Sequence, residues 1–376
     1  MNKVFKWCLL IVVLCVVIEG TSLIGLFIIK ERMFGLTFDM ILADKVAEIH
    51  KEAIGILLSG RRGRSVFYDP MLGWVQEPKG SVVSHASDSE NRIRIAAFGD
   101  SFTKGSGIEM LASNSKNLEI LNFGVGGYGF DQSYLRYLQE GPTFDFHVIL
   151  IGFMTENCNR NLNVYRPFYF PIGRLACSKP RFTLVNGELR LIENPLREIS
   201  QYQELLDNPK EMLERLGAND RYFNHRPKSS ICDVSATVRL VKLVIWGLRH
   251  NHLIRAYIRN GFYNEQSEGF QITKRIFDKF HDAVVANGSL PLIILFPRKV
   301  DVLQHQKDGI RVYQPLTNYF DEKAYRYVDL LEAFDEQKAV HKTQDLFQPD
   351  GMHYNEKGNE IIRNYIYSYL AKNNFQ

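Results

Sequence analysis

A serine follows directly on a short apolar run in "AAFGDSFTKG", residues 96–105. A serine in this position has two interpretations: it caps the structure that follows, or it serves as a nucleophile. A nucleophile needs a base to take its proton, a group that orients the base, and donors for the developing oxyanion. The role of Ser101 therefore depends on the partners that the rest of the sequence supplies.

A base and its orienting group stand together near the C-terminus, in "PDGMHYNEKG", residues 349–358. Asp350 and His353 are three residues apart, so one turn can bring the carboxylate to the imidazole Nδ1. That contact would fix the tautomer and leave Nε2 facing the serine. The alternative is a loop aspartate beside an exposed histidine, and the D-x-x-H spacing alone does not decide between them.

Two further motifs offer oxyanion donors. The glycines of "LNFGVGGYGFDQ", residues 121–132, let the backbone approach a ligand and point an N–H group at it. In "GFMTENCNRN", residues 152–161, Asn157 offers a side-chain amide. The alternatives are an ordinary strand-to-helix turn and a turn asparagine, so each motif is weak when taken alone.

The elements that must position these residues alternate between strand and helix. Five apolar runs are typical of buried strands: residues 93–98, 118–123, 146–153, 290–297 and 325–330. Helical patterns lie between or after them: residues 131–140, 268–287 and 355–372, the last with Asn355 as its N-cap. The alternation predicts an α/β fold with a parallel sheet covered on both faces, whose sites lie beyond the carboxyl ends of the strands.

An insertion at about 160–260 separates the third and fourth strands. Its Asn186-Gly187 pair joins two alternating segments and predicts a hairpin within residues 181–195. Helix-like stretches follow at 196–216 and 230–259. Two interpretations of the insertion stay open: a packed elaboration of the fold, or a cap over the site.

Residues 8–29 are apolar almost throughout, and at about 1.5 Å per residue a helix of this length reaches roughly 33 Å, enough to cross a bilayer. We expect residues 1–32 to be an uncleaved membrane anchor, because the run is longer than a signal peptide needs and no small-x-small site follows it. Glu19 interrupts the run and is protonated, snorkelling or paired with another helix. Residues 33–75 would form a stalk or linking helix, and residues 76–376 the main domain.

Charge and cysteine usage exclude several classes of protein. The net charge of +4 comes from interspersed residues, and the only dense basic cluster, at 61–64, is too short to indicate a nucleic-acid partner. The five cysteines include no C-x-x-C pair, which argues against a zinc or redox site. Cys158 and Cys177 are either a disulfide or two free thiols. The sequence leaves open whether there is a protein partner.

Taken together and in this order, the motifs resemble those of the SGNH hydrolases, the GDSL esterase/lipase superfamily, in a membrane-anchored form; the resemblance spans residues 90–370. It implies a three-layer α/β/α domain with a mostly parallel five-stranded, flavodoxin-like sheet, and no metal or organic cofactor. It also implies catalytic roles for Ser101 (nucleophile), His353 (base) and Asp350 (orienting group). The oxyanion donors would be the N–H groups of Ser101 and Gly127 and the amide of Asn157.

The resemblance has one departure, in the asparagine motif. Thr155 stands where the family has glycine, and Cys158 replaces the usual aspartate. Cys158 is an alternative nucleophile, but it has no obvious local activator. "GDSFT" also differs from the G-x-S-x-G turn of α/β-hydrolases, because Thr103 occupies the last position.

The activity that the resemblance implies is serine-dependent hydrolysis of an acyl ester, on a small-molecule, glycan or lipid substrate at the cell envelope. The domain would face the extracytoplasmic side, as the basic N-terminus before residue 8 also suggests. One alternative is an O-acyltransferase that modifies a polysaccharide. Another is an inactive glycan-binding module, with the aromatic stretch 165–170 as its binding platform.

Overall fold

The computed structural model describes residues 3–60, 67–80, 92–114, 117–173, 175–349 and 351–373. The chain divides into two compact units. The first, which we call the helical unit, comprises Met1–Arg61, Asn163–Lys179 and Asn194–Arg255. The second, which we call the sheet unit, comprises Arg62–Leu162, Pro180–Glu193 and Ala256–Gln376.

The sheet unit is built on a five-stranded parallel sheet in the order β11-β10-β5-β3-β4. Its strands are β3 (Ile93–Phe98), β4 (Leu118–Asn122), β5 (Val148–Met154), β10 (Leu290–Phe296) and β11 (Tyr327–Asp329). Each strand lies within a few residues of a predicted apolar run. The order places the first strand between the second and the third, which is the flavodoxin-like doubly wound arrangement. The predicted fold class is confirmed.

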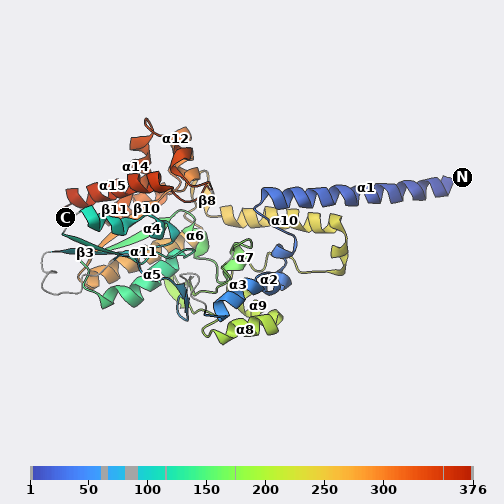
Figure 1. Cartoon of the computed structure of the whole chain (residues 1–376), viewed down its shortest axis with the longest axis horizontal. Coiled ribbons are helices and arrows are strands. Elements are labelled where there is room, and N and C mark those ends of the chain that lie inside the picture. The colour runs from blue at the N-terminus through green and yellow to red at the C-terminus, as the bar shows by residue number, and fades with distance from the viewer. Residues whose placement is uncertain are drawn as a thin grey trace. The chain divides into compact units, whose positions relative to one another are not determined.

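Helices cover both faces of this sheet, as the continuous apolar strands require (Figure 1). On one face, α5 (Phe130–Glu140) and α11 (Glu268–Ala286) pack on each other and on the strands. Their core includes Phe277, whose ring centroid lies 4.4 Å from that of Phe130. The other face carries α14 (Leu330–Gln337) and α15 (Glu356–Lys372). Asn355 Oδ1 accepts the N–H of Gly358 at 3.1 Å, so the predicted N-cap of α15 is confirmed.

Short hairpins and helices complete the sheet unit. The β6–β7 hairpin turns at Asn186 and Gly187, with φ of +51° and +82°, as the sequence predicted. The strand pairs are β1 (Phe67–Asp69) with β2 (Gly73–Val75), β6 (Arg181–Val185) with β7 (Glu188–Ile192), and β8 (Ile258–Arg259) with β9 (Phe262–Tyr263). The helices are α4 (Ser101–Gly105), η4 (Ile108–Asn114), η5 (Gly141–Thr143), α6 (Asn157–Arg160), α12 (Lys299–Asp308), α13 (Gln314–Lys323) and η7 (Thr343–Leu346).

The helical unit contains no strand longer than an isolated bridge among its described residues. Its elements are α1 (Lys3–Arg32), η1 (Asp39–Ile41), η2 (Ala43–Lys45), α2 (Val46–Ile49), α3 (Lys51–Leu58), α7 (Arg166–Tyr169), α8 (Ser200–Asp207), α9 (Pro209–Gly217), η6 (Ile231–Val234) and α10 (Ala236–Arg255). Segments far apart in the chain share one apolar cluster: Leu36, Phe38, Ile41, Leu42, Leu243 and Trp246. Residues after α1 thus pack against the insertion.

The aromatic stretch at 165–170 lies in the core of the helical unit. Tyr165, Phe168 and Tyr169 are buried, and Phe168 packs on Phe223 with ring centroids 4.8 Å apart. These three side chains fill the interior of the unit and so are not available as a binding platform, whereas Phe170 of the same stretch is exposed.

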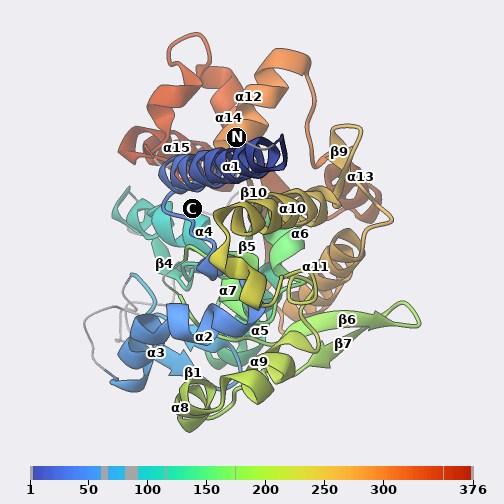
Figure 2. The same ribbon diagram turned by 90° about the vertical axis from the view of Figure 1, so that its right-hand side faces the viewer.

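One helix in the described part of the chain, α1, is long and apolar enough to cross a membrane. Its side chains are exposed over most of its length. The C-terminal half of α1 lies beside α10, and the two helices are adjacent in both Figure 1 and Figure 2.

Candidate active site

Ser101 is the first residue of α4, three residues after β3 ends at Phe98. Asp100 caps this short helix: its carboxylate accepts the N–H of Phe102 at 2.8 Å. The serine thus follows the carboxyl end of a central strand, as the sequence predicted. Because it opens the helix, its own N–H is one of the donors that have no partner within the helix.

Close packing of α4 against the sheet explains two glycines around the serine. A Cβ added to Gly99 would lie 1.9 Å from Thr103 Oγ1, and one added to Gly152 would lie 2.0 Å from the same atom. Thr103 therefore occupies the space that the two missing side chains leave, at the ends of β3 and β5. Its hydroxyl is buried and makes no hydrogen bond within the described residues. Thr103 serves packing here, which accounts for the threonine in "GDSFT".

We expect Gly152→Ala to destabilise the sheet unit, because the new methyl group would clash with Thr103 Oγ1 and with the Phe296 ring at 2.8 Å. Overpacking of this kind typically costs about 1–3 kcal/mol. The measurement is the free energy of unfolding in urea. The matched double variant Gly152→Ala/Thr103→Ala should regain much of the loss; if both forms are equally destabilised, Thr103 is not the obstacle.

His353, near the C-terminus, lies beside Ser101 although the two residues are far apart in the sequence. Its Nε2 lies 3.0 Å from Ser101 Oγ. The loop that carries it is closed by a bridge between Phe347 and Tyr354 and turns at Gly351, where φ is +69°. The Tyr354 hydroxyl donates to the carbonyl of Pro297 at 2.6 Å, directly after β10. The histidine loop is thus tied to the same edge of the sheet as Ser101.

The contact between His353 and Ser101 has the geometry of a base and its nucleophile. The distance lies in the range of a hydrogen bond from hydroxyl to imidazole. The Phe102 ring lies 5.2 Å from the imidazole and limits how far it can swing. Asp350, the predicted orienting group, lies outside the described residues.

Two bonds from a neighbouring segment and one within the motif hold the glycine motif in place. Trp74 Nε1 donates to the Gly126 carbonyl at 3.1 Å, and Gln76 Oε1 accepts the Gly126 N–H at 3.1 Å. The N–H of Gly124 is also engaged, with Asn122 Oδ1 at 3.0 Å. Gly127 has a φ of +82°, a conformation that favours glycine, and its N–H makes no hydrogen bond within the described part of the chain. Of Gly124, Gly126 and Gly127, only Gly127 therefore has an N–H without a partner among the described residues.

Asn157 is fully buried at the start of α6, just after β5 ends. With its amide nitrogen turned toward Asp100, it donates to Asp100 Oδ2 at 3.3 Å, while its oxygen accepts the N–H of Met154 at 3.2 Å. An amide nitrogen carries two N–H groups, so the bond to Asp100 orients the amide and leaves the second N–H for another acceptor.

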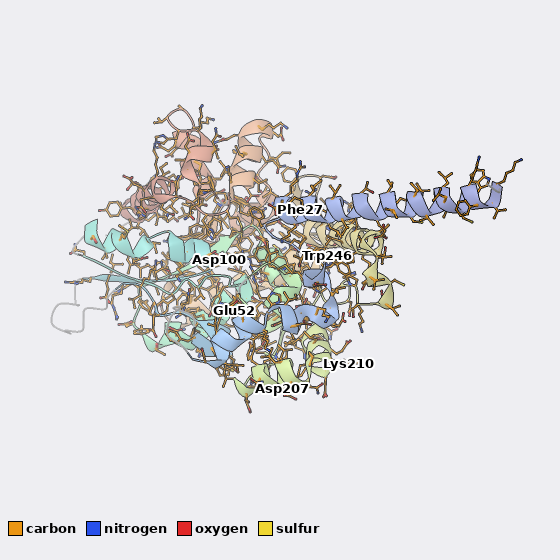
Figure 3. All side chains as sticks on the ribbon, turned by 45° about the vertical axis from the view of Figure 1, so that its right-hand side comes forward. Phe27, Glu52, Asp100, Asp207, Lys210 and Trp246 are labelled. Atoms are coloured by element: carbon orange, nitrogen blue, oxygen red, sulfur yellow. The ribbon has the colours of Figure 1, made fainter. Side chains whose placement is uncertain are left out.

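A buried ion pair lies beneath these groups. Arg160 Nη1 lies 3.2 Å from Asp100 Oδ2, with side chains 4% and 1% exposed, and Figure 3 labels Asp100 within the sheet unit. Arg160 also donates to the Tyr128 carbonyl at 3.1 Å. Burial raises the pKa of the Asp100 carboxyl, whereas the charge of Arg160 and the Phe102 N–H act in the opposite direction. Asp100 thus joins the serine, glycine and asparagine motifs through one charged network.

The two departures in the asparagine motif have structural explanations. Thr155 Oγ1 donates to Asp301 Oδ2 at 2.6 Å, a bond that glycine cannot make. Cys158 is buried, and burial raises the pKa of its thiol to about 12. A thiol with that pKa is protonated at neutral pH and is a poor nucleophile. Cys158 and Cys177 are both free, which answers the question that their spacing left open.

We expect Cys158 and Cys177 to be unreactive in the folded protein, because both thiols are buried and burial raises the pKa of each to about 12. The test is titration with a thiol reagent at pH 8, on a form in which Cys8, Cys15 and Cys232 are replaced by serine. Native protein should not react, and urea should release two thiols. Rapid labelling of the native form would contradict the buried placement.

Sequence reasoning missed Arg160, Gln76 and the second role of Asp100. Arg160 and Asp100 are 60 residues apart, and neither stands in a periodic pattern that predicts pairing. The one signal for Arg160 in the sequence was its position shortly after the predicted strand at 146–153, beyond the carboxyl end where the other motifs also lie.

No group of histidine, cysteine and carboxylate side chains in the described residues is arranged to hold a metal ion. The described groups can transfer a proton between the Ser101 hydroxyl and the His353 imidazole. N–H donors lie nearby, in the segments that follow β3, β4 and β5.

Comparison with known proteins gives structural matches alone: no family model and no curated protein matches the chain. A member of the lipolytic protein G-D-S-L family from Veillonella parvula is similar over 74% of this chain and 99% of its own, at 12% identity and a TM-score of 0.37. A GDSL-like lipase from Bacteroides thetaiotaomicron is similar over 78% of this chain and 92% of its own, at 11% identity and a TM-score of 0.34. The lipase/acylhydrolase from Enterococcus faecalis is similar over 75% of this chain and 96% of its own, at 10% identity and a TM-score of 0.35. Similarity at this level carries no weight for function, which is inferred from the site.

Proposed function

We propose that this protein is a serine esterase that cleaves an acyl ester through an acyl-serine intermediate. The observation that carries the proposal is the 3.0 Å contact between His353 Nε2 and Ser101 Oγ at the carboxyl edge of the sheet. A hydroxyl is a weak nucleophile at its own pKa and becomes effective when a base takes its proton during attack. The same contact weighs against an inactive binding module.

In the first half-reaction, His353 Nε2 takes the proton of Ser101 as Oγ bonds to the ester carbonyl carbon. The negative charge on the carbonyl oxygen is stabilised by the N–H groups of Ser101 and Gly127 and by the amide of Asn157. When the tetrahedral intermediate collapses, the imidazolium returns its proton to the leaving alcohol. Asp350 would hold Nδ1–H and stabilise the cation.

In the second half-reaction a hydroxyl acceptor, activated by His353, attacks the acyl-serine carbonyl and releases Ser101. Water as acceptor makes the protein an esterase, whereas a sugar hydroxyl makes it an O-acyltransferase. We propose an acylated carbohydrate or lipid of the cell envelope as the substrate class, with α1 as a membrane anchor and the sheet unit on the extracytoplasmic side. The length and apolar character of α1 support the anchor.

The test is hydrolysis of p-nitrophenyl acetate by the full chain in detergent, with Ser101→Ala as the matched variant. We expect turnover by the wild type and a loss of at least about 10³ in kcat/KM in the variant. Equal rates in two folded proteins would overturn the proposal. Adding a glycan acceptor tests its second half: acyl product on the sugar in place of acetate indicates a transferase.

A further inference from the structure

The carboxylate of Glu19, in the middle of the apolar stretch of α1, is bound by a second helix. It accepts a hydrogen bond from the Ser235 hydroxyl and another from the Ala236 N–H, the latter at 2.7 Å. Ala236 is the first residue of α10. Glu19 therefore caps the N-terminus of α10 from outside that helix, where a negative charge is favoured and the backbone N–H groups lack partners.

Beyond this cap, α1 and α10 run side by side in the same direction. The Ser22 and Thr237 hydroxyls lie 3.1 Å apart, and a Cβ on Gly25 would lie 3.0 Å from a methyl carbon of Leu240. Small residues at the interface allow this close approach, as between helices within membranes. Further along, Leu26 and Ile29 pack on the cluster that contains Trp246.

The faces turned away from this contact are apolar on both helices. On α10 the exposed apolar side chains follow helical spacing: Val241, Val244, Ile245 and Leu248. On the matching part of α1 they are Leu23, Ile24, Phe27 and Ile28. The turn η6 before α10 adds Ile231 and Val234, which are 89% and 87% exposed. An apolar surface of this extent is unusual for a protein face in water.

We propose that residues 231–248 are embedded in the same bilayer leaflet as the second half of α1, so that the membrane domain is a full span with a half-span beside it. This inference rests on α1 being a membrane anchor. Lipid is the occupant because the exposed face of α10 continues that of α1. From Glu19 to Lys30 a helix rises about 16 Å, roughly half of a hydrocarbon core.

Two of the polar groups in this segment have partners that suit that depth. The N-terminus of α10, which would be costly in hydrocarbon, has its first N–H bound by Glu19. Lys242 pairs with Asp233 at 2.6 Å. Basic residues follow the embedded stretch of each helix, Lys30 and Arg32 on α1 and the exposed Arg249 on α10, where lipid phosphates would meet them.

The test uses native and introduced thiols in the full chain, reconstituted in phosphatidylethanolamine–phosphatidylglycerol nanodiscs. Forms with one exposed cysteine, either Cys232 (in η6) or Cys15 (in α1), keep the buried Cys158 and Cys177 and are labelled with a nitroxide. Two further forms lack all three exposed native thiols. One carries Leu248→Cys, and the other carries Gln203→Cys on the exposed side of α8 as a control position in water. Collision rates with oxygen, which partitions into lipid, and with a water-soluble nickel complex are compared.

At Cys232 and Leu248→Cys we expect frequent collisions with oxygen and few with nickel, as at Cys15, and the reverse at Gln203→Cys. Nickel access at Cys232 and Leu248→Cys with Cys15 protected would overturn the half-span and leave the anchor intact. Nickel access at Cys15 as well would overturn both. Low collision rates with both reagents at Cys232 would mean that protein covers the face, and would overturn the inference in favour of a second copy or a partner helix.

The cap can be tested separately. Removing it with Glu19→Ala should raise nickel access at Cys232 several-fold while Cys15 stays protected, because the start of α10 then lacks its acceptor. Glu31→Ala, at an exposed position near the end of α1, is the matched control and should change neither probe. An unchanged Cys232 in Glu19→Ala would contradict a role of Glu19 in holding the segment in lipid.

Discussion

Replacing His353 by alanine is expected to lower kcat/KM for p-nitrophenyl acetate by at least about 10³, because it removes the one base that lies within hydrogen-bond reach of Ser101 among the described residues. The loss should fall mainly on kcat, since the base acts in the transition state. His341→Ala is the matched control: this histidine also lies in the sheet unit, outside the contact with Ser101, and its loss should leave the rate within a few-fold of wild type.

The double variant Ser101→Ala/His353→Ala sharpens this prediction. Residues that act as one unit are not additive, so the double variant should be about as slow as either single variant. A double variant that is slower by the product of the two single effects would mean that Ser101 and His353 act independently. That result would contradict the proposed proton transfer between them.

Removing Arg160 is expected to cause the largest loss of stability. Arg160→Met would leave the carboxylate of Asp100 buried without its cation, and breaking a buried pair in this way typically costs about 3–5 kcal/mol. The measurement is the free energy of unfolding of the full chain in urea at pH 7. The double variant Asp100→Asn/Arg160→Met removes both charges and keeps an N-cap for Phe102, so it should recover much of the loss.

The pH dependence of Arg160→Met follows from the same carboxyl group. Burial already raises the pKa of Asp100 in the wild type, and loss of Arg160 removes the main opposing charge, so the folded-state pKa rises further. A group whose pKa is raised on folding stabilises the protein at low pH and loses that contribution as the pH rises through its folded value. Arg160→Met should therefore be closest to wild type in acid and fall behind as the pH increases. A difference that is constant from pH 4 to 8 would contradict this explanation.

The sheet could be predicted from local sequence because its strands are continuous apolar runs. Their ends were less exact: residues 146–153 were predicted where β5 is Val148–Met154, and 325–330 where β11 is Tyr327–Asp329. The apolar runs extend beyond the paired backbone because Phe146 and Leu330, near the ends of these strands, are buried as well. The hairpin at Asn186 was predicted closely, since that turn chemistry depends on two residues alone.

The site could be predicted only where one side chain defines a role. The serine and histidine motifs predicted a meeting of Ser101 and His353, and the structure has them in contact. The pairing of Arg160 with Asp100 could not be predicted from local sequence, because it is a tertiary contact between segments that are 60 residues apart. Glu19 had three interpretations from sequence, and the bond to Ser235 and Ala236 shows that it pairs with another helix.

The most direct test of the acyl-serine mechanism is to identify the residue that an activated fluorophosphonate modifies in the folded full chain. Peptide mass spectrometry after the reaction should find one adduct, on Ser101, and His353→Ala should slow its formation by orders of magnitude. An adduct on another residue, or no adduct on folded wild-type protein, would contradict the account.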